Sequence, residues 1–405
     1  MGGKMSGRNL IVYLNGNKTG ILHESRSSAL RFTYTDEAEA PISLAMPLNA
    51  VYGDEQTRAF FENLLPEGDL REMVAQAHRV SSNNPFSLLK EIGRDCAGAV
   101  VLGDDLLLND TTSLQELFDV EQFVSKNDAI LHYELGMRHS LAGAQFKTTV
   151  TIINDTYYIP SPFFPSTHII KFANPRFQDL VANEFFCMTL ARQIGLNVPN
   201  VSLLSSGSLV YLLVERFDRL IKSDKIERVH QEDFCQILGY LSSNKYEDEG
   251  GPRLIQIVKA IDRYSKQRAA DLASLAKLII FNYLMGNCDG HAKNLSMIHS
   301  STGPYLAPFY DLVATSIYQG RSTRNATSIN GVFDLESIDK AAIIKEFDQF
   351  GISGKRILAL VLRDFKDIVS IGKEVARHKA LEPYQATINL IIGNMSKRLD
   401  RLAKE

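Results

Sequence analysis

Short strand patterns, one long helical pattern and a hairpin pattern follow one another between residues 146 and 216, and this order constrains the fold more than any other feature. The strand patterns are Phe146–Ile153, Tyr157–Ile159 and His168–Phe172. A helix is predicted over Val181–Ile194, because its apolar residues fall on one stripe and Gly195 follows as a terminator. A hairpin then pairs Val201–Leu204 with Leu209–Arg216.

The chain changes character after this segment. From Gln231 onward the pattern is almost entirely helical, apart from irregular stretches near residues 242–252 and 289–315. Strands with one inserted helix, followed by a helical half, predict an α+β fold with two lobes, as in protein kinases. The N-lobe is expected to be β-rich and the C-lobe all-helical.

A further small unit is predicted at the start of the chain. Leu10–Leu14 and Gly20–Leu22 flank Asn15-Gly16, which favours the positive φ angles of a hairpin turn. Further strands are expected at Leu30–Tyr34 and Ile42–Met46, and helices between Arg58 and Lys90. The expected division is an α/β module over residues 8–105, a connector with the N-lobe over 106–220, and the C-lobe over 221–405. Residues 1–7 are given no structural role.

Composition excludes several classes of protein. No segment reaches the roughly 18–20 apolar residues of a membrane helix, and the N-terminus has no apolar signal core, so a cytoplasmic location is expected. Four cysteines lie far apart without Cys-x-x-Cys spacing, and four of the histidines, His139, His168, His230 and His291, share no metal-binding spacing, so zinc is not predicted. A net charge of −3 gives no global field for a polyanion.

The sharpest chemical signal is Cys288-Asp-Gly-His-Ala-Lys-Asn294, followed by Tyr310-Asp311. Phosphoryl transfer from a nucleotide needs a carboxylate to orient or accept the proton of the attacking hydroxyl, and oxygen ligands for Mg²⁺. Asp289 and Asn294 are spaced so that one can face the acceptor and the other the metal, which Asp311 would complete. A lone Asp-Gly is usually a turn, and the rest of the motif argues against that reading.

Seven motifs in order make the sequence similar to the HipA family along nearly its whole length. They are Ser140-Leu-Ala-Gly-Ala-Gln-Phe-Lys-Thr148, Thr167-His-Ile-Ile-Lys171, Asn183-Glu184, Val214-Glu-Arg-Phe-Asp218, Gln231-Glu-Asp-Phe-Cys-Gln236, Asp289-Gly-His-Ala-Lys-Asn294 and Pro308-Phe-Tyr-Asp311. An ordered set of this kind is far more specific than any one motif.

The resemblance implies a role for each matching residue. It makes Asp289 the catalytic base, Asn294 and Asp311 the Mg²⁺ ligands, and Lys171 the strand lysine that contacts the nucleotide phosphates. The implied phosphate loop consists of Ala142, Gly143, Ala144, Gln145, Phe146 and Lys147. The implied hinge at adenine consists of Glu215, Arg216 and Phe217, and further ATP contacts are His291, Ala292, Lys293 and Tyr310, together with Asn294 and Asp311.

Other readings stay open for several of these residues. Taken alone, Gly143 is more often a turn, Lys171 an edge lysine, and Glu215-Arg216 a local ion pair. Phe146 departs from the family pattern, where a charged or polar residue is common. Ser140 matches a serine that is autophosphorylated in the family; otherwise it caps or turns the chain.

Glu184 has two readings. It either pairs with Lys171, as the helix glutamate of protein kinases does, or belongs to the exposed face of an amphipathic helix.

The same resemblance implies a function and partners. It implies an ATP- and Mg²⁺-dependent serine/threonine kinase that is the toxin of a toxin–antitoxin pair and phosphorylates a translation component such as glutamyl-tRNA synthetase. Growth arrest and persistence would follow. A HipB-like antitoxin would bind the kinase and, together with it, repress the operon at operator DNA.

Two rival functions remain. One is a kinase of the same fold that phosphorylates a small molecule. The other is a pseudokinase that only binds its antitoxin and DNA, against which the presence of Lys171, Asp289, Asn294 and Asp311 argues. A hydrolase reading of Asp218, Asp233 and Asp289 lacks support, because the sequence does not fix their separation.

Overall fold

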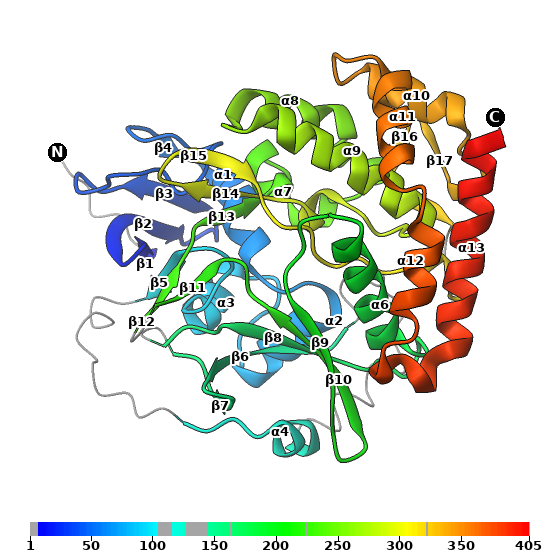
Figure 1. Ribbon diagram of the computed structural model, residues 1–405. Coiled ribbons are helices and arrows are strands. Elements are labelled where there is room, and N and C mark those ends of the chain that lie inside the picture. The colour runs from blue at the N-terminus through cyan, green and yellow to red at the C-terminus, as the bar shows by residue number, and fades with distance from the viewer. Residues whose placement is uncertain are drawn as a thin grey trace.

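The computed structural model describes residues 7–103, 116–126, 145–161, 164–222, 225–320 and 323–404. Two antiparallel sheets and a group of helices form its main parts (Figure 1). The predicted α+β class with a protein-kinase-like arrangement is confirmed.

The N-terminal module is a five-stranded antiparallel sheet, in the order β4-β3-β2-β1-β5, with helices packed beside it. Alternate side chains such as Leu10, Val12 and Phe32 are buried in its core. Its elements are β1 (Gly7–Leu14), β2 (Asn17–Ser25), β3 (Leu30–Tyr34), β4 (Val51–Tyr52), β5 (Val100–Gly103), α1 (Asp54–Phe61), a 3₁₀ turn (Glu62–Leu64), α2 (Gly68–Ala77) and α3 (Pro85–Ile92).

The prediction of a strand at Ile42–Met46 is wrong. This segment forms a tight turn with a single bridge between Ser43 and Met46. Ile42 and Met46 are buried, which explains the apolar pattern, but the backbone is held by a remote carboxylate instead of a neighbouring strand. Glu232 accepts hydrogen bonds from the Ser43 hydroxyl at 2.6 Å and from the Leu44 N–H at 2.7 Å.

The second sheet has the order β7-β6-β8-β10-β9 and is antiparallel throughout. It confirms the strands and the hairpin that the sequence predicted, to within two residues at each end. Its strands are β6 (Lys147–Ile153), β7 (Thr156–Tyr158), β8 (His168–Phe172), β9 (Val201–Ser206) and β10 (Leu209–Glu215), and α4 (Val120–Lys126) lies next to it, within the predicted connector.

Helix α6 (Leu180–Gln193) lies between this sheet and the C-terminal helices α12 and α13 (Figure 1). The helix itself was predicted, but the amphipathic character was wrong, because nearly every residue from Leu180 to Ala191 is buried. A helix enclosed on all sides has no solvent face, so its polar residues Asn183 and Glu184 must find partners inside the protein.

The C-terminal part is mainly helical, with short strands that the sequence analysis did not predict. Its helices are α7 (Phe234–Leu238), α8 (Leu254–Tyr264), α9 (Arg268–Met285), α10 (Lys340–Asp348), α11 (Gly354–Asp364), α12 (Ile368–Val375) and α13 (Gln385–Lys404). The strands are β11 (Arg219–Lys222) with β12 (Lys225–Arg228), β13 (Gln231–Asp233) with β14 (Ser296–Ser300) and β15 (Gly303–Leu306), and β16 (Arg324–Ile329) with β17 (Val332–Asp334).

A network of buried ions attaches the N-terminal module to the rest of the chain. Arg216 binds Asp218 through both carboxylate oxygens, at 2.9 and 2.8 Å, and also donates to the Cys96 carbonyl at 3.0 Å. Arg219 reaches Asp95 of the module at 3.1 Å. Because these charges are desolvated, their mutual pairing fixes the module against the segment that follows β10.

His230 makes a second attachment and leads to a pH-dependence prediction. The ring is buried, with Nε2 2.8 Å from the Ile42 carbonyl oxygen, and burial lowers the pKa of His230 to about 4. A folded-state pKa below the unfolded value of about 6.5 means that the neutral ring stabilises the fold above pH 6.5 and that this contribution is lost as the pH falls towards 4. The loss amounts to about 1.4 kcal/mol per pH unit.

We therefore expect His230→Gln to be less sensitive to acid than the wild type between pH 6.5 and 4. Urea unfolding at several pH values measures this as the slope of unfolding free energy against pH. His78→Gln serves as the matched variant at an exposed histidine. Equal slopes for His230→Gln and the wild type would contradict the assignment of a buried neutral ring.

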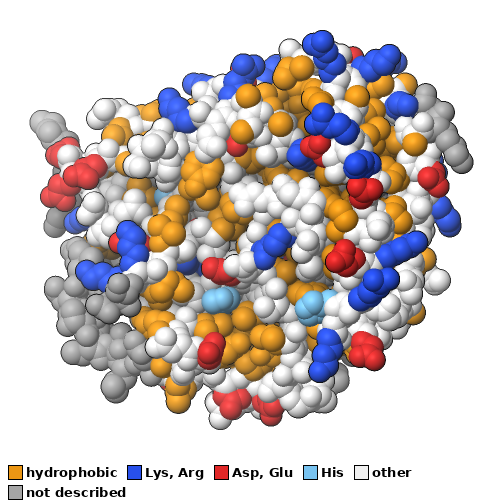
Figure 2. Space-filling model, viewed as in Figure 1, with side chains coloured by type: hydrophobic (Ala, Val, Ile, Leu, Met, Phe, Trp, Pro, Cys, Tyr) orange, Lys and Arg blue, Asp and Glu red, His pale blue; other side chains and the backbone are white. Residues whose placement is uncertain are grey.

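Acidic and basic side chains are interspersed over the face shown in Figure 2, and many lysines and arginines lie towards the edge formed by the C-terminal helices. This distribution agrees with the formal net charge of −3, because so small a net charge produces no electrostatic field of one sign around the whole protein. A search of the described residues finds no helix with the length and apolar character that a membrane crossing demands.

Candidate active site

A cavity of about 280 Å³ lies where the N-terminal module, the second sheet and the C-terminal part meet. Each of the three parts contributes to its wall. From the module come residues 63–67 and Leu70, from the sheet Lys147, Lys171 and Glu215, and from the C-terminal part Asp233, Lys245, Lys293, Asn294, Tyr310 and Asp311. Several residues that the sequence singled out thus line one space.

Lys171 on β8 is the centre of an ion triad in which Lys171 and Glu184 are buried and Asp311 is partly exposed. Its Nζ lies 2.5 Å from Oε1 of Glu184 on α6 and is also in direct contact with the Asp311 carboxylate. Burial alone would lower the pKa of Lys171, but the two carboxylates outweigh it and raise the pKa above its ordinary value. Burial opposes the ionisation of Asp311 as well, yet the ammonium group of Lys171 lowers the pKa of Asp311.

Glu184 is the weaker acid of the triad, because burial raises its pKa despite the neighbouring ammonium group. The structure thus decides between the two readings of this residue: it pairs with Lys171 and is only 1% exposed. Lys147 stands opposite Lys171 in the strand register of β6 and β8. Both lysines line the cavity. Burial and the nearby Lys171 lower the pKa of Lys147.

Asp289 lies on the loop after α9, which ends at Gly286 in the left-handed conformation that glycine favours. Tyr246 donates its hydroxyl to Asp289 Oδ1 at 2.7 Å. Asn287 accepts from the Asp289 N–H at 3.1 Å, and Asn294 donates from its side-chain amide to the Asp289 carbonyl at 3.0 Å. The loop is thus fixed by its own side chains, with the Asp289 carboxylate 18% exposed.

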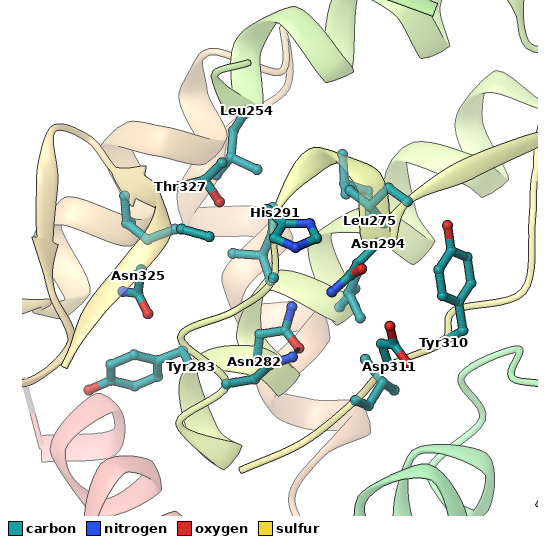
Figure 3. Close-up of a pocket in the computed structure, with 18 of the residues that line it drawn as sticks. Leu254, Leu275, Asn282, Tyr283, His291, Asn294, Tyr310, Asp311, Asn325 and Thr327 are labelled. Atoms are coloured by element: carbon teal, nitrogen blue, oxygen red, sulfur yellow. Dashed lines mark hydrogen bonds between the residues drawn. The ribbon is translucent and has the colours of Figure 1, made fainter. Parts of the chain in front are cut away.

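Asn294 and Asp311 lie close together, with Tyr310 beside them (Figure 3). The amide nitrogen of Asn294 is used inside the loop, and Asp311 is held ionised, so both offer oxygen to a cation. Asp311 has a φ of 57°, a left-handed conformation that is uncommon for an aspartate and is maintained by its surroundings.

This pair of oxygen donors fits Mg²⁺, which usually takes one or two protein ligands together with substrate phosphates. Within the described ranges, no three His, Cys, Asp or Glu side chains gather as a metal site of their own.

His291 and Ala292 are placed deeper in the same loop, and both are buried. The His291 ring packs edge-on against Tyr246 with the ring centres 5.3 Å apart, and it also borders a smaller cavity of about 50 Å³ behind the loop. Neither ring nitrogen has a hydrogen-bond partner in the described part of the chain. Burial lowers the pKa of His291 to about 3, so this ring is neutral at pH 7.

The predicted hinge residues are used in three different ways. Phe217 stacks on Tyr310, with ring centres 5.7 Å apart and planes 26° apart, and both rings line the cavity. Arg216 binds Asp218 with its guanidinium group, within the buried ion network. Glu215 is exposed at its side chain and accepts from Asn200 at 2.5 Å. The alternative of an ion pair between Glu215 and Arg216 is therefore wrong: Arg216 pairs with Asp218, and Glu215 accepts from the neutral amide of Asn200.

The predicted phosphate loop lies partly outside the described residues, as do Ser140, Ala142, Gly143 and Ala144. Gln145 donates its side-chain amide to the Phe172 carbonyl at 3.2 Å. Phe146 is buried and packs against Phe123 and Phe172, with ring centres 5.7 and 5.4 Å apart. The departure at position 146 is thus explained by an aromatic cluster beneath the sheet.

Lys293 is bound by three oxygen groups. Its Nζ lies 2.9 Å from Oε1 of Glu67, 3.1 Å from the Asn63 carbonyl oxygen and 4.0 Å from Asp233. Lys245 contacts the other oxygen of Glu67. Burial opposes the ionisation of Glu67, but the two lysines prevail and lower the pKa of Glu67 to about 2.

No site role was predicted for Glu67, Lys245 or Tyr246. Asp233 appeared only within the family motif at positions 231–236 and in the hydrolase reading, which lacked support. Burial raises the pKa of Asp233 to about 7, although Lys293 acts in the opposite direction. Glu67 lies more than 160 positions before its partners, and no local pattern marks it. Only the Asp233-x-x-Gln236 capping box at the start of α7 was visible as a local signal.

Comparison with known proteins gives a consistent result over the whole chain. A family model described as the HipA-like C-terminal domain matches residues 139–372, and one described as the HipA N-terminal domain matches residues 10–103. The protein Y4mE of Sinorhizobium fredii is 36% identical over 391 aligned positions, and the match covers 92% of each chain. A serine/threonine-protein kinase toxin HipA of Shewanella oneidensis is 30% identical over 83% of this chain and 81% of the relative.

The fold agrees with these sequence matches. The solved complex of Shewanella oneidensis HipA with HipB and its operator DNA contains a chain that matches with a TM-score of 0.89 at 26% identity. The match covers 98% of this chain and 97% of that one. Both the N-terminal module and the two lobes therefore have counterparts in a solved structure.

Proposed function

This chain belongs to the HipA family, and from that membership and the geometry of the cavity we propose that it is an ATP- and Mg²⁺-dependent protein serine/threonine kinase. The observation that carries the proposal is the convergence of Lys171, Asp289, Asn294 and Asp311 on one cavity wall and the loop beside it. The proposed parts are the module of residues 8–105, the connector with the N-lobe of 106–220 and the C-lobe of 221–405.

Asp289 is the proposed catalytic base. In the reaction, the oxygen of a serine hydroxyl forms a bond to the γ-phosphorus of ATP, the bond from that phosphorus to the bridging oxygen of ADP breaks, and the hydroxyl proton passes to the Asp289 carboxylate. Tyr246 orients that carboxylate by donating to it at 2.7 Å, and Asn287 and Asn294 hold the backbone of Asp289. A base that is already oriented needs little reorganisation when the acceptor arrives.

Lys171 and Lys147 are the proposed phosphate contacts on the sheet side, and Glu184 keeps Lys171 directed into the cavity. The backbone of Ala142–Lys147 would cradle the phosphates, as the family pattern implies. The backbone of the hinge, Glu215, Arg216 and Phe217, would meet adenine, and Tyr310 would be a further nucleotide contact. Asn294 and Asp311 would bind Mg²⁺, which supplies charge neutralisation at the phosphates.

We further propose that the protein is the toxin of a toxin–antitoxin pair and is located in the cytoplasm. The support is the family and the likeness to a chain solved with HipB and operator DNA. A HipB-like antitoxin would bind this kinase, and the complex would repress its operon. Phosphorylation of a translation component such as glutamyl-tRNA synthetase would cause growth arrest and persistence.

Autophosphorylation gives the most direct biochemical test of the reaction class. With radiolabelled ATP and Mg²⁺, we expect phosphate to appear on Ser140 of the wild type, and we expect Ser140→Ala to lose that label while it still labels a protein acceptor. Phosphopeptide mass spectrometry locates the modified residue. Label that stays with Ser140→Ala at the wild-type level would show that another residue is the acceptor.

The same reaction separates the rival kinase function. A kinase of this fold that acts on small molecules would consume ATP with a metabolite mixture and leave both itself and purified glutamyl-tRNA synthetase unlabelled. That outcome would contradict the protein-kinase proposal and favour the rival.

A further inference from the structure

A carboxylate of the N-terminal module reaches into the cavity of the proposed kinase site. Glu67 is the residue directly before α2, three positions after the end of the 3₁₀ turn Glu62–Leu64. Its side chain is 19% exposed and contacts two lysines of the C-terminal part, Lys293 at 2.9 Å and Lys245 through the other oxygen. A module outside the two lobes therefore contributes a charged group to the site.

The backbone around Glu67 is tied to the same region, so its position is well determined. Asn63 donates from its side chain to the Tyr240 carbonyl at 2.9 Å, and its own carbonyl accepts from Lys293. Gln236, on α7, donates to the Phe60 carbonyl at 3.0 Å. These bonds bring the end of α1 and the following turn against α7 and the segment after it.

Each lysine that Glu67 contacts is adjacent to a group with a proposed catalytic role. Lys293 lies within the loop Asp289–Asn294, next to the proposed metal ligand. Lys245 lies over the ring of Tyr246 at 5.4 Å, and Tyr246 donates to the Asp289 carboxylate. The Glu67 carboxylate is thus linked through Lys293 to the loop of the proposed metal ligand Asn294, and through Lys245 to the side of Asp289.

We propose that Glu67 is a positioning residue of the kinase site, through which the N-terminal module fixes Lys293 and Lys245 relative to Asp289. This inference rests on the proposed kinase function. Without the carboxylate, both ammonium groups would lose the partner that sets their direction. A negative charge near the phosphates would also disappear, so ATP would bind as well as before or more tightly while the transfer step became slower.

The test compares Glu67→Gln with the wild type in ATP-dependent phosphorylation. We expect kcat to fall by about 100-fold, the size of effect that misplacement of a reacting group produces, with KM for ATP unchanged or lower. Glu67→Asp keeps the charge and should recover part of kcat. Glu62→Gln is the matched control, because Glu62 belongs to the same module but pairs with Arg58 at 2.7 Å and does not line the cavity.

Three results would overturn the proposal: wild-type kcat in Glu67→Gln, a raised kcat as expected of an autoinhibitory anion, or an equal loss in kcat and in ATP binding with a lowered unfolding temperature. The last result would indicate a purely structural role.

A second readout does not depend on turnover. Labelling with an amine-reactive acetylating reagent, followed by mass spectrometry, should modify Lys245 and Lys293 faster in Glu67→Gln than in the wild type, and at the wild-type rate in Glu62→Gln. Unchanged labelling would show that Glu67 does not restrain the lysines. A wild type without any phosphoryl transfer would instead refute the proposed function, while the labelling still decides whether Glu67 binds the two lysines.

Discussion

Replacement of Asp289 by Asn should reduce phosphoryl transfer to protein by about 10²- to 10⁴-fold, the range of a lost general base. The change keeps the size of the side chain and an oxygen that can accept from Tyr246, so the loop should retain its conformation. What is lost is the negative charge that takes the proton of the acceptor hydroxyl. Initial rates with radiolabelled ATP, at saturating nucleotide and acceptor, measure the effect.

The binding of ATP provides the internal control for this variant. Because Asp289 is assigned to the proton and not to the nucleotide, ATP affinity should stay close to that of the wild type. A variant that transfers phosphate at the wild-type rate would remove Asp289 from the catalytic role. A variant that loses ATP binding together with activity would indicate a role in nucleotide binding instead.

Lys171→Met should have the largest effect on stability. It leaves Glu184, which is 1% exposed, and Asp311 without the ammonium group they share. Removal of one partner of a buried ion pair costs about 3–5 kcal/mol of unfolding free energy, because the remaining charge stays desolvated. Activity should be lost as well, since the proposed phosphate contact is gone. Urea unfolding and the labelled-ATP assay measure the two effects.

The double variant Lys171→Met, Glu184→Gln separates stability from catalysis. With the buried carboxylate neutralised, much of the unfolding free energy should return, whereas activity should not. Lys222→Met serves as the matched control, because Lys222 pairs with Glu227 at 2.7 Å on the surface, where an exposed ion pair contributes less than about 1 kcal/mol. A single variant at Lys171 that is as stable as the wild type would contradict the ion triad.

The second sheet illustrates what local pattern can predict. The prediction was nearly exact for strands β6, β8, β9 and β10 and for helix α6. Each strand has a clear apolar pattern that ends at turn residues, and the helix has a helical period that ends at Gly195. The ordering of these elements was enough to identify a kinase-like arrangement. The spacing of the motif around Asp289 indicated Asn294 and Asp311, and the family resemblance indicated Lys171. The structure brings these three residues to one cavity.

The wrong and missing predictions have a common physical cause. At each of these places the observed structure depends on contacts between residues far apart in the sequence. Ile42–Met46 has the apolar pattern of a strand, but its backbone is bound by Glu232, almost 190 positions later. Helix α6 has buried polar residues because Lys171 lies opposite Glu184, and no local period shows that. Glu67 is one more example, since only the docking of the module places its carboxylate between two lysines.

The hinge shows a mixed outcome. The motif at positions 214–218 indicated a functional segment, and Phe217 does line the cavity beside Tyr310. The motif could not show that the Arg216 guanidinium binds Asp218 and the Cys96 carbonyl and so attaches the N-terminal module. One family motif therefore holds a residue whose ring lines the cavity and a residue whose side chain serves docking, and only side-chain geometry separates the two.

Growth arrest on induced expression is the measurement that tests the central claim, a toxin that acts as a kinase, most directly. Wild-type protein expressed without an antitoxin should stop growth, and co-expression of the antitoxin should restore it. Asp289→Asn, expressed to the same level, should leave growth unchanged. Equal arrest by the wild type and by Asp289→Asn would contradict a catalytic mechanism and favour a pseudokinase that acts by binding alone.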